Sequence, residues 1–440
     1  MSGSGLESLA ATVRRTEVCR RISRVQGLES ERIQIEGSTR SLSIGDQIGF
    51  LGETEGLRGE VVRVDREMAD IVVEGDHASI KLGEAAVHLG PMELYPSDAW
   101  IGRVLNSSGQ PLDGRPVQQG QIRTPLFQKP PPAAARRGFG ARLSTGLNAL
   151  NTFLPMVQGQ RIGLFAGSGV GKSSLLGTLA TELDADICVV ALVGERGREV
   201  SDFVRHVLGA HGLRKSVVIA STSDEPSLSR RRAALSAMCV AEYFRDQGRH
   251  VLFLMDSVTR FAEAHREIAT LAGELPAMRG YPPSTQSLLA SLVERAGSGS
   301  GAQGDITAVF SVLVAGSDMD EPIADTLRGL LDGHIVLSRE IAERGRFPAI
   351  DVMASVSRSF REATAPEEEA TIEKATRLLT VFQEAETLIK SGLFQPEHDP
   401  ELAQSAAIFP PLDAFLGRRA INGIGGSFAC LRDILGEATP

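Results

Sequence analysis

The feature that most constrains the fold is the segment RIGLFAGSGVGKSSLLGTLA, residues 161–180. Its pattern predicts a buried strand that ends near Phe165, a tight glycine-rich loop and an amphipathic helix. Glycines let the N–H groups of such a loop turn inward on a phosphate group, and the positive end of the following helix faces the same group. The segment therefore predicts a phosphate loop between a strand and a helix of an α/β domain.

Two side chains indicate that the loop binds a nucleoside triphosphate with its metal ion. Lys172 can reach the β and γ phosphates, and Ser173 can place its hydroxyl on Mg²⁺. The strict pattern has glycine where this chain has Ala166, which is small enough for the same turn. A dinucleotide-binding loop is the rival interpretation, but it needs no Lys-Ser pair and its glycines are spaced differently. The residues predicted to bind ATP here are Gly167, Ser168, Gly169, Val170, Gly171, Lys172, Ser173 and Ser174.

Further apolar runs follow the phosphate loop. Runs that are apolar on both faces are typical of strands buried in a parallel sheet, and helical patterns lie between them. This alternation indicates a doubly wound sheet, whose ligands bind beyond the carboxyl ends of the strands. The predicted strands are 162–166, 187–193, 251–255, 306–314 and 335–337.

Two of these strands bring carboxylates to that edge of the sheet. The run VLFLMDSVTR places Asp256 at the end of a strand, where an acid can order Mg²⁺. The run VVALVGERGREV places Glu195 just past another strand, where a carboxylate can orient and polarise the attacking water. Arg196 beside it can meet a terminal phosphate with two hydrogen bonds. Glu199 is either a ligand of Mg²⁺-bound water or an ordinary first-turn acid favoured by the helix dipole.

The sequence pattern changes on both sides of this region. Short β-rich runs separated by glycines and polar turns predict a small N-terminal barrel, with strands at 32–35, 47–50, 59–64 and 71–73. From Pro366 the pattern is helical. The predicted domains are a solvated tail or docking helix at 1–18, a β-barrel at 19–96, a nucleotide-binding domain at 97–365 and a helical domain at 366–440.

Composition narrows the functional classes. A net charge of −9 argues against a protein that coats nucleic acid, because phosphate binding needs a basic surface. The cysteines form no CxxC pair, so we expect reduced thiols and no zinc site. No apolar run reaches the length of a membrane span, and the N-terminus lacks a secretory signal pattern. We therefore expect a cytoplasmic protein without a nucleic-acid partner.

Longer motifs follow one another along the chain: AGSGVGKS, GERGREV, LMDSVTRFAEAHREI, RGYPPS, LDGHIVLSRE, FPAIDVMASVSR and QPEHDPEL. From about Trp100 to Phe415 the chain resembles the ATPases of type III protein export, and among them most the flagellar branch. That family is related to the catalytic β subunit of rotary ATP synthases. The resemblance implies an α/β fold: a RecA-like P-loop NTPase core with an N-terminal β-barrel domain and a C-terminal helical domain.

The resemblance also implies roles for residues of the predicted site. Lys172 and Ser173 match the phosphate and Mg²⁺ ligands, and Asp256 matches the Walker B acid. Glu195 matches the catalytic carboxylate, and Arg196 a phosphate-contacting arginine. The expected cofactors are thus ATP and Mg²⁺.

Two more residues are marked by the resemblance alone. Arg358, in SVSRS, matches an arginine finger that reaches into the site of a neighbouring subunit. Phe347 matches the aromatic residue on which adenine stacks; relatives usually have tyrosine there, and phenylalanine keeps the π face. Because one chain holds both the phosphate loop and the finger, identical subunits arranged head to tail can complete every site. The family implies a homohexamer.

The function implied is hydrolysis of ATP that energises type III export of flagellar proteins and unloads chaperone-bound substrates at the export gate. The implied partners are a regulatory stalk protein at the N-terminal helix, a central stalk protein, membrane proteins of the export gate, export chaperones and flagellar substrates. The implied location is the cytoplasmic side of the inner membrane at the flagellar base, with peripheral attachment.

Two departures and three alternatives accompany this interpretation. The stretch after Ser284 changes several positions, and the glycine-rich tail after Phe415 departs from the usual helical ending. One alternative keeps the enzyme and places it in a virulence-type secretion apparatus. A second is an RNA-dependent helicase motor, which should have a basic, aromatic face on the barrel; the barrel region here holds many acids and few aromatics. A third is a noncatalytic ring subunit, which the set Lys172, Glu195, Asp256 and Arg358 argues against.

Overall fold

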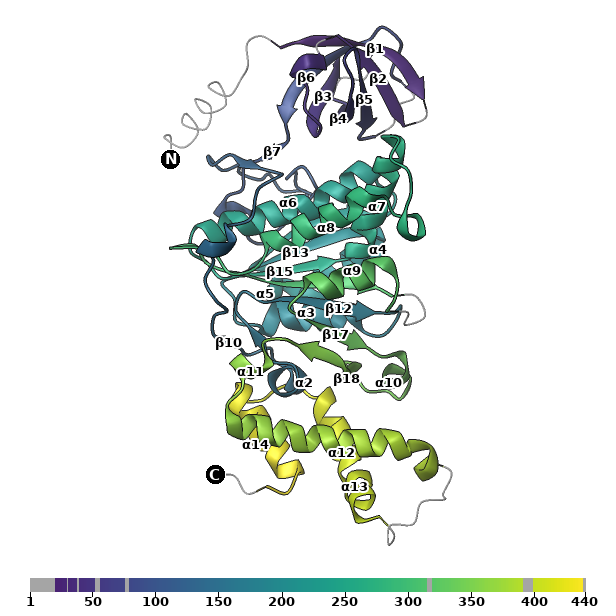
Figure 1. Ribbon diagram of the computed structural model, residues 1–440. Coiled ribbons are helices and arrows are strands. Elements are labelled where there is room, and N and C mark those ends of the chain that lie inside the picture. Colours follow the sequence, from purple (N-terminus) through teal and green to yellow (C-terminus); the bar gives the residue numbers. More distant parts are fainter. Residues whose placement is uncertain are drawn as a thin grey trace, which may run out of the picture.

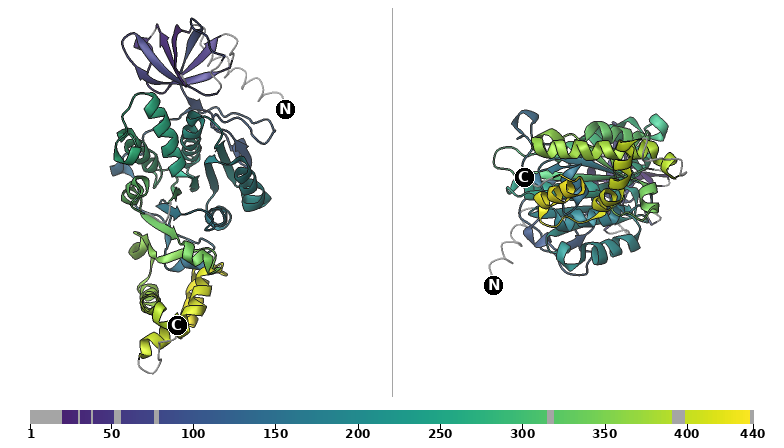
Figure 2. Two further views of the ribbon diagram at one scale, coloured as in Figure 1. Left: turned by 90° about the vertical axis from the view of Figure 1, so that its right-hand side faces the viewer. Right: turned by 90° about the horizontal axis from the view of Figure 1, so that it is seen from below.

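The computed structural model describes residues 20–29, 31–37, 39–51, 56–75, 79–314, 319–390 and 399–437. The predicted docking helix at 1–18 lies outside these residues. A barrel, a sheet domain and a group of helices follow one another along the long axis of the molecule, in the order of the sequence (Figures 1 and 2). This arrangement agrees with the predicted fold class, whereas the predicted domain boundaries stay a prediction.

The N-terminal part is a closed antiparallel barrel with the strand order β1-β2-β5-β4-β3-β6. Alternate side chains point inward, as Ile33 and Ile35 do in β2, and form a core of their own. The strands β2 to β5 were predicted from the sequence, whereas β1 and β6, which close the barrel, were not. The strands are β1 (Ile22–Glu29), β2 (Arg32–Glu36), β3 (Asp46–Leu51), β4 (Arg58–Val64), β5 (Met68–Val73) and β6 (Ala85–Pro91), and the 3₁₀ helix η1 (Thr39–Ser41) precedes β3.

The central part is an eight-stranded sheet with the order β18-β17-β12-β16-β15-β13-β14-β8. Its neighbours are parallel except for β18, which pairs antiparallel with β17 at one edge. All five predicted strands are present, whereas β8, at the other edge, was not predicted. The strands are β8 (Arg103–Leu105), β12 (Arg161–Ala166), β13 (Ile187–Glu195), β14 (Ser216–Thr222), β15 (Val251–Asp256), β16 (Ile306–Leu313), β17 (Gly333–Leu337) and β18 (Ile350–Ser357).

Helices cover both faces of the sheet, which explains why its strands are apolar on both sides. In β13, Val189 and Ala191 belong to the core under one face, and Val190 and Leu192 to the core under the other. Helices α6, α7 and α8 lie on the side nearer the barrel, and α3 and α5 on the opposite side (Figure 1). The helices are α3 (Lys172–Glu182), α4 (Gly197–Asp202), the π-helix η4 (Phe203–Leu208), α5 (Gly209–Leu213), α6 (Ser227–Asp246), α7 (Val258–Leu271), η5 (Met278–Gly280), α8 (Pro283–Arg295), α9 (Pro322–Leu330) and α10 (Arg339–Glu343).

The C-terminal part is helical, as predicted: α12 (Pro366–Lys390), α13 (Pro400–Gly417) and α14 (Gly423–Ile434), preceded by α11 (Phe360–Ala363). The expectation that the glycine-rich tail departs from a helical ending was wrong. Phe428 and Leu431 of α14 are buried in the core beneath the sheet, and this burial outweighs the low helix propensity of glycine.

Short elements connect the three parts. They are β7 (Glu93–Leu94), η2 (Asp98–Trp100), β9 (Thr124–Pro125), η3 (Ala133–Ala135), β10 (Arg142–Leu143), α2 (Asn148–Thr152) and β11 (Met156–Val157). Among the described residues, no helix is both long and apolar enough to span a membrane.

Candidate active site

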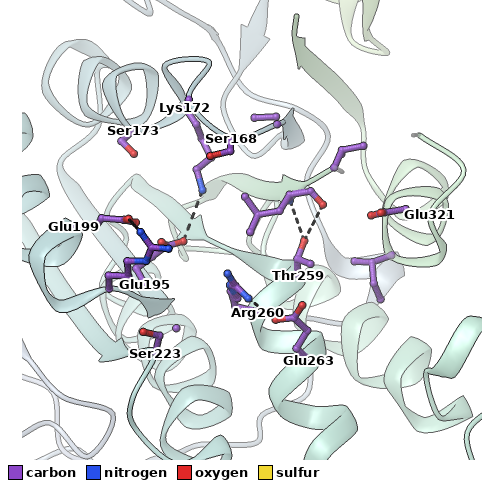
Figure 3. Close-up of a pocket in the computed structure, with 18 of the residues that line it drawn as sticks. Ser168, Lys172, Ser173, Glu195, Glu199, Ser223, Thr259, Arg260, Glu263 and Glu321 are labelled. Carbon is purple, nitrogen blue, oxygen red and sulfur yellow. Dashed lines mark hydrogen bonds and ion pairs between the residues drawn. The ribbon is translucent and has the colours of Figure 1, made fainter. Parts of the chain in front are cut away.

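A pocket of about 940 Å³ opens at the carboxyl ends of the central strands, next to the phosphate loop (Figure 3). Ten of the predicted site residues line it: Gly167, Ser168, Gly169, Gly171, Lys172, Ser173, Ser174, Glu195, Arg196 and Glu199. Val170 does not, because its side chain is buried in the core below the loop.

The phosphate loop has the backbone that its glycines allow. Gly169 and Gly171 have φ angles of 79° and 90°, in the left-handed region that other residues avoid. A Cβ on Gly171 would also lie 3.1 Å from Cδ1 of Phe347. Helix α3 begins at Lys172, so Lys172 and Ser173 occupy its first turn at the positive end of the helix dipole. The loop can therefore cradle an anion with backbone groups.

Lys172 connects the phosphate loop to the acids of the neighbouring strands. Its Nζ hydrogen-bonds to Oδ1 of Asp256, the last residue of β15, and lies 3.8 Å from Oε1 of Glu195, the last residue of β13. The hydroxyl of Ser311 in β16 donates to the same Oδ1 of Asp256 over 2.7 Å. The structure thus brings together Lys172, Glu195 and Asp256, which are far apart in the sequence, as the doubly wound sheet predicts.

The carboxyl group of Glu195 lies in a setting that favours its neutral form. Desolvation raises its pKa, the charge of Asp256 raises it further, and Lys172 opposes both; the result is a pKa of about 7. A carboxylate whose pKa lies near the working pH is suited to accept a proton during catalysis.

Arg196 and Glu199 line the outer part of the pocket. The side chain of Arg196 is 82% exposed and that of Glu199 is 53% exposed, with 3.8 Å between Nη1 and Oε1. Both side chains are largely exposed, so each can turn toward a bound ligand by giving up this pairing.

Phe347 and Arg358 do not line the pocket. The Phe347 ring is 51% exposed and lies against Gly171 of the phosphate loop. Arg358 follows β18 and is exposed; its backbone N–H donates to Asp332 and its Nη2 to the carbonyl of Arg328. Arg358 lies near Gly333, at the amino end of β17, whereas the phosphate loop follows the carboxyl end of β12. Within one chain, Arg358 and the phosphate loop therefore lie at opposite ends of the strands.

Sequence reasoning missed a second wall of the pocket. Thr259, Arg260 and Glu263 of α7 line it, at the spacing of one helix face directly after Asp256. That spacing was a usable signal. Other lining residues, such as Arg279 of η5 and Glu321 just before α9, come from separate segments and have no local sequence signal.

The residues present fit Mg²⁺ and ATP. Among the described residues, no cluster of three or more His, Cys, Asp or Glu side chains could hold a metal ion by itself. Mg²⁺ usually takes only one or two protein ligands and completes its shell with phosphates and water, and Ser173 and Asp256 are of that kind. The left-handed glycines and the pocket volume suit a triphosphate.

Comparisons with known proteins agree with this geometry. Residues 146–357 match the ATP synthase alpha/beta family, nucleotide-binding domain, and residues 364–419 match the T3SS EscN ATPase C-terminal domain. The flagellum-specific ATP synthase of Caulobacter vibrioides is 42% identical over 98% of this chain and 99% of its own length. That of Salmonella typhimurium is 47% identical over 74% of this chain and 71% of its own.

Solved structures show the same likeness. The assembled ATPase EscN of the enteropathogenic E. coli type III secretion system superposes with a TM-score of 0.88 at 33% identity, covering 94% of this chain and all of the solved EscN chain. EscN in complex with its central stalk EscO superposes with a TM-score of 0.86.

Proposed function

This chain belongs to the flagellum-specific branch of the type III export ATPases, within the ATP synthase alpha/beta family, and we propose that it drives flagellar protein export with Mg²⁺-dependent ATP hydrolysis. The chain is an ATPase, and ATP is its nucleotide. The observation that carries the proposal is the position of Glu195, a carboxyl group with a pKa of about 7, within 3.8 Å of the phosphate-loop lysine.

Different residues of the pocket have different roles in ATP hydrolysis. The loop N–H groups and Lys172 bind the β and γ phosphates. Ser173 of the pocket and Asp256 beside Lys172 would hold Mg²⁺, and Glu199 would contact the water around the ion. When bound, the metal ion neutralises the charge that develops on the phosphates. Phe347 supports adenine beside Gly171.

Glu195 orients the attacking water and takes its proton as the water oxygen bonds to the γ phosphorus. The bond between the γ phosphorus and the bridging oxygen breaks, and ADP leaves with that oxygen. Arg196 and Arg260, which line the pocket, balance the negative charge on the transferred group. Lys172 lies between the acids before ATP binds, so the phosphates replace carboxylates as its partners.

Arg358 acts in the site of a neighbouring subunit. It is exposed and lies at the opposite end of the strands from its own phosphate loop, so only another copy of the chain can bring it to a γ phosphate. Head-to-tail contacts of this kind close into a ring. A homohexamer is therefore the active form, in keeping with the assembled EscN.

The remaining partners follow the family. A central stalk protein binds this chain as EscO binds EscN. A regulatory stalk protein binds residues 1–18, and export chaperones with their flagellar cargo and the membrane proteins of the export gate complete the machine. The enzyme works at the cytoplasmic side of the inner membrane, at the flagellar base.

The test is Mg²⁺-dependent ATP hydrolysis per subunit over a wide range of protein concentration. The specific activity should rise with concentration as rings form. Glu195→Gln should abolish turnover and keep ATP binding. Arg358→Ala should lower turnover by about 10³-fold or more, the usual contribution of an arginine finger.

Arg361→Ala is the matched control, because Arg361 is an exposed arginine three residues from the finger. Its activity should equal that of the wild type. A flat concentration dependence together with a fully active Arg358→Ala variant would refute the shared site. A wild type that binds ATP but never hydrolyses it would refute the enzymatic role itself.

A further inference from the structure

The second wall of the pocket contains an arginine that already forms an ion pair with a glutamate. Nη1 of Arg260 lies 3.0 Å from Oε2 of Glu263, one turn further along α7 (Figure 3). The Arg260 side chain is 44% exposed and that of Glu263 is 27% exposed. Both line the nucleotide pocket, so this ion pair is in contact with the space that the triphosphate fills.

The stem of Arg260 is fixed, whereas its guanidinium group has a choice of partners. A Cβ on Gly194 would lie 3.2 Å from Cβ of Arg260, so the stem packs against the residue just before Glu195. The hydrogen bond to Glu263 raises the pKa of Arg260 most, and the charges of Glu263, Glu195 and Glu199 raise it further. Of these carboxylates, only Glu263 is in hydrogen-bond contact with Arg260.

The other charged residues of the pocket explain why the contact between Arg260 and Glu263 matters for binding a triphosphate. Its cations are Lys172, Arg196, Arg260 and Arg279, and its carboxylates are Glu195, Glu199, Glu263 and Glu321. Lys172 is also bonded to Asp256. Arg196 and Arg260 also pair with carboxylates, whereas Arg279 donates to the backbone carbonyl of Asp320. An incoming triphosphate therefore gains Lys172, Arg196 or Arg260 as a partner only by displacing a carboxylate.

We propose that Glu263 is a positioning residue: it holds Arg260 at the pocket wall without nucleotide and competes with the terminal phosphate of ATP for it. This inference rests on the proposed function of the same site. ADP lacks the terminal phosphate, so the competition bears on ATP more than on ADP. Glu263 thus weakens ATP binding selectively and sets the ratio of ATP affinity to ADP affinity.

The experiment measures dissociation constants by calorimetry for a Mg²⁺-bound non-hydrolysable ATP analogue and for Mg²⁺-ADP. Glu263→Gln removes the charge and keeps the shape of the side chain. The analogue should bind the variant about two- to fivefold more tightly, the range expected from a partly exposed ion pair, and ADP should bind nearly as before.

Two controls separate this mechanism from others. Glu321→Gln removes the same charge from the same pocket but not from Arg260, so it should shift both nucleotides alike. In an Arg260→Ala background, Glu263→Gln should not increase affinity for the analogue further, because Glu263 acts through Arg260 and that side chain is absent.

Each outcome decides a different point. A Glu263→Gln variant that binds the analogue as the wild type does, or more weakly, overturns the inference. So does a gain that persists without Arg260, or one that is equal for both nucleotides. A wild type that binds neither nucleotide overturns the proposed function as well, so the two failures are distinguishable.

Discussion

The nucleotide-binding domain joins its two neighbours through different chemistry. At the barrel, Glu60 of β4 accepts hydrogen bonds from Arg231 and Arg232 of α6, and Glu74 pairs with Arg232 over 2.7 Å. Glu60 and Arg232 are almost completely buried. The barrel core itself is a separate cluster of apolar residues. The barrel is thus a unit with its own core, attached through charged groups.

The C-terminal helices have no such separation. Leu412 and Phe415 of α13 and Leu431 of α14 belong to the same apolar cluster as Leu164 of the sheet and Leu176 of α3. Leu176 lies one turn after the lysine of the phosphate loop, in the helix that the loop opens. Damage at this junction therefore reaches the nucleotide site through continuous packing, whereas damage inside the barrel should stay there.

Truncating one buried phenylalanine on each side tests this difference most strongly. Phe415 is 1% exposed and Phe50 in the barrel is 2% exposed. Each Phe→Ala change should cost about 3–5 kcal/mol of local stability. The chain has a single tryptophan, Trp100, which is buried in the core between the sheet and α6. Its fluorescence during urea unfolding reports on the nucleotide-binding domain.

The Trp100 transition should shift to lower urea in Phe415→Ala and stay in place in Phe50→Ala. Affinity for ATP should fall only in Phe415→Ala. If Phe50→Ala moved the Trp100 transition as far, the barrel would not be an independent unit.

Glu60→Gln tests the charged junction. The change leaves Arg231 and Arg232 buried without their carboxylate, which should cost about 3 kcal/mol because Glu74 still pairs with Arg232. The barrel should become sensitive to limited proteolysis while ATP still binds. Glu67→Gln, an exposed glutamate of the barrel, is the control and should leave the digestion pattern unchanged. Equal patterns in both variants would show that the ion pairs do not hold the barrel.

The sequence predicted the nucleotide-binding domain better than either junction. Runs such as 187–193 and 251–255 are apolar on both faces and long enough to be unambiguous. The strand β8 is only three residues long, and β1 contains a bulge between Val25 and Gly27 that breaks its alternation. Helix α14 has low intrinsic propensity and exists because Phe428 and Leu431 are buried by segments far away in the sequence.

The residues of the site also differ in whether a local sequence pattern predicts their position. The phosphate loop follows a strand, and Glu195 and Asp256 end two others, so local pattern places all three at the carboxyl ends of the strands. The ion pair between Arg260 and Glu263 could have been found from helical spacing after Asp256. The separate segments that bring Arg279 and Glu321 to the pocket depend on tertiary packing, which a local pattern does not record.

Acid should weaken the barrel junction through His265. Its Nε2 lies 2.9 Å from Oγ of Ser284, and the charged groups around it are Arg231, Glu274 and Glu60. Burial, and next the charge of Arg231, lowers its pKa from 6.5 to about 4. Between these values only the unfolded chain binds the proton, so stability falls as the pH falls from 6.5 toward 4.

From pH 7 to pH 5 this residue should remove about 2 kcal/mol of stability. His265→Gln should unfold with a shallower pH dependence, measured by urea titration at each pH. The matched variant is needed because Glu195, whose pKa is raised, works in the opposite direction: its contribution falls as the pH rises toward 7. Parallel pH curves for the two proteins would contradict the assignment to His265.

The smallest effect is expected at a polar cluster inside the apolar junction. Ser427 of α14 is 1% exposed; its hydroxyl donates to Oδ1 of Asn148 over 2.9 Å, and Nδ2 of Asn151 donates to it over 3.2 Å. Ser427→Ala leaves both buried amides short of a partner, which should cost about 1–2 kcal/mol. Ser427→Thr keeps the hydroxyl and serves as the control for hydrogen bonding.

If the two junctions differ as described, Ser427→Ala should lower the Trp100 transition slightly, because α2 and α14 pack on the core that also contains α3. It should leave barrel proteolysis unchanged. An effect of Ser427→Ala as large as that of Phe415→Ala would mean that hydrogen bonds, and not apolar packing, join the C-terminal helices to the nucleotide-binding domain. The contrast with the barrel junction would then be one of degree only.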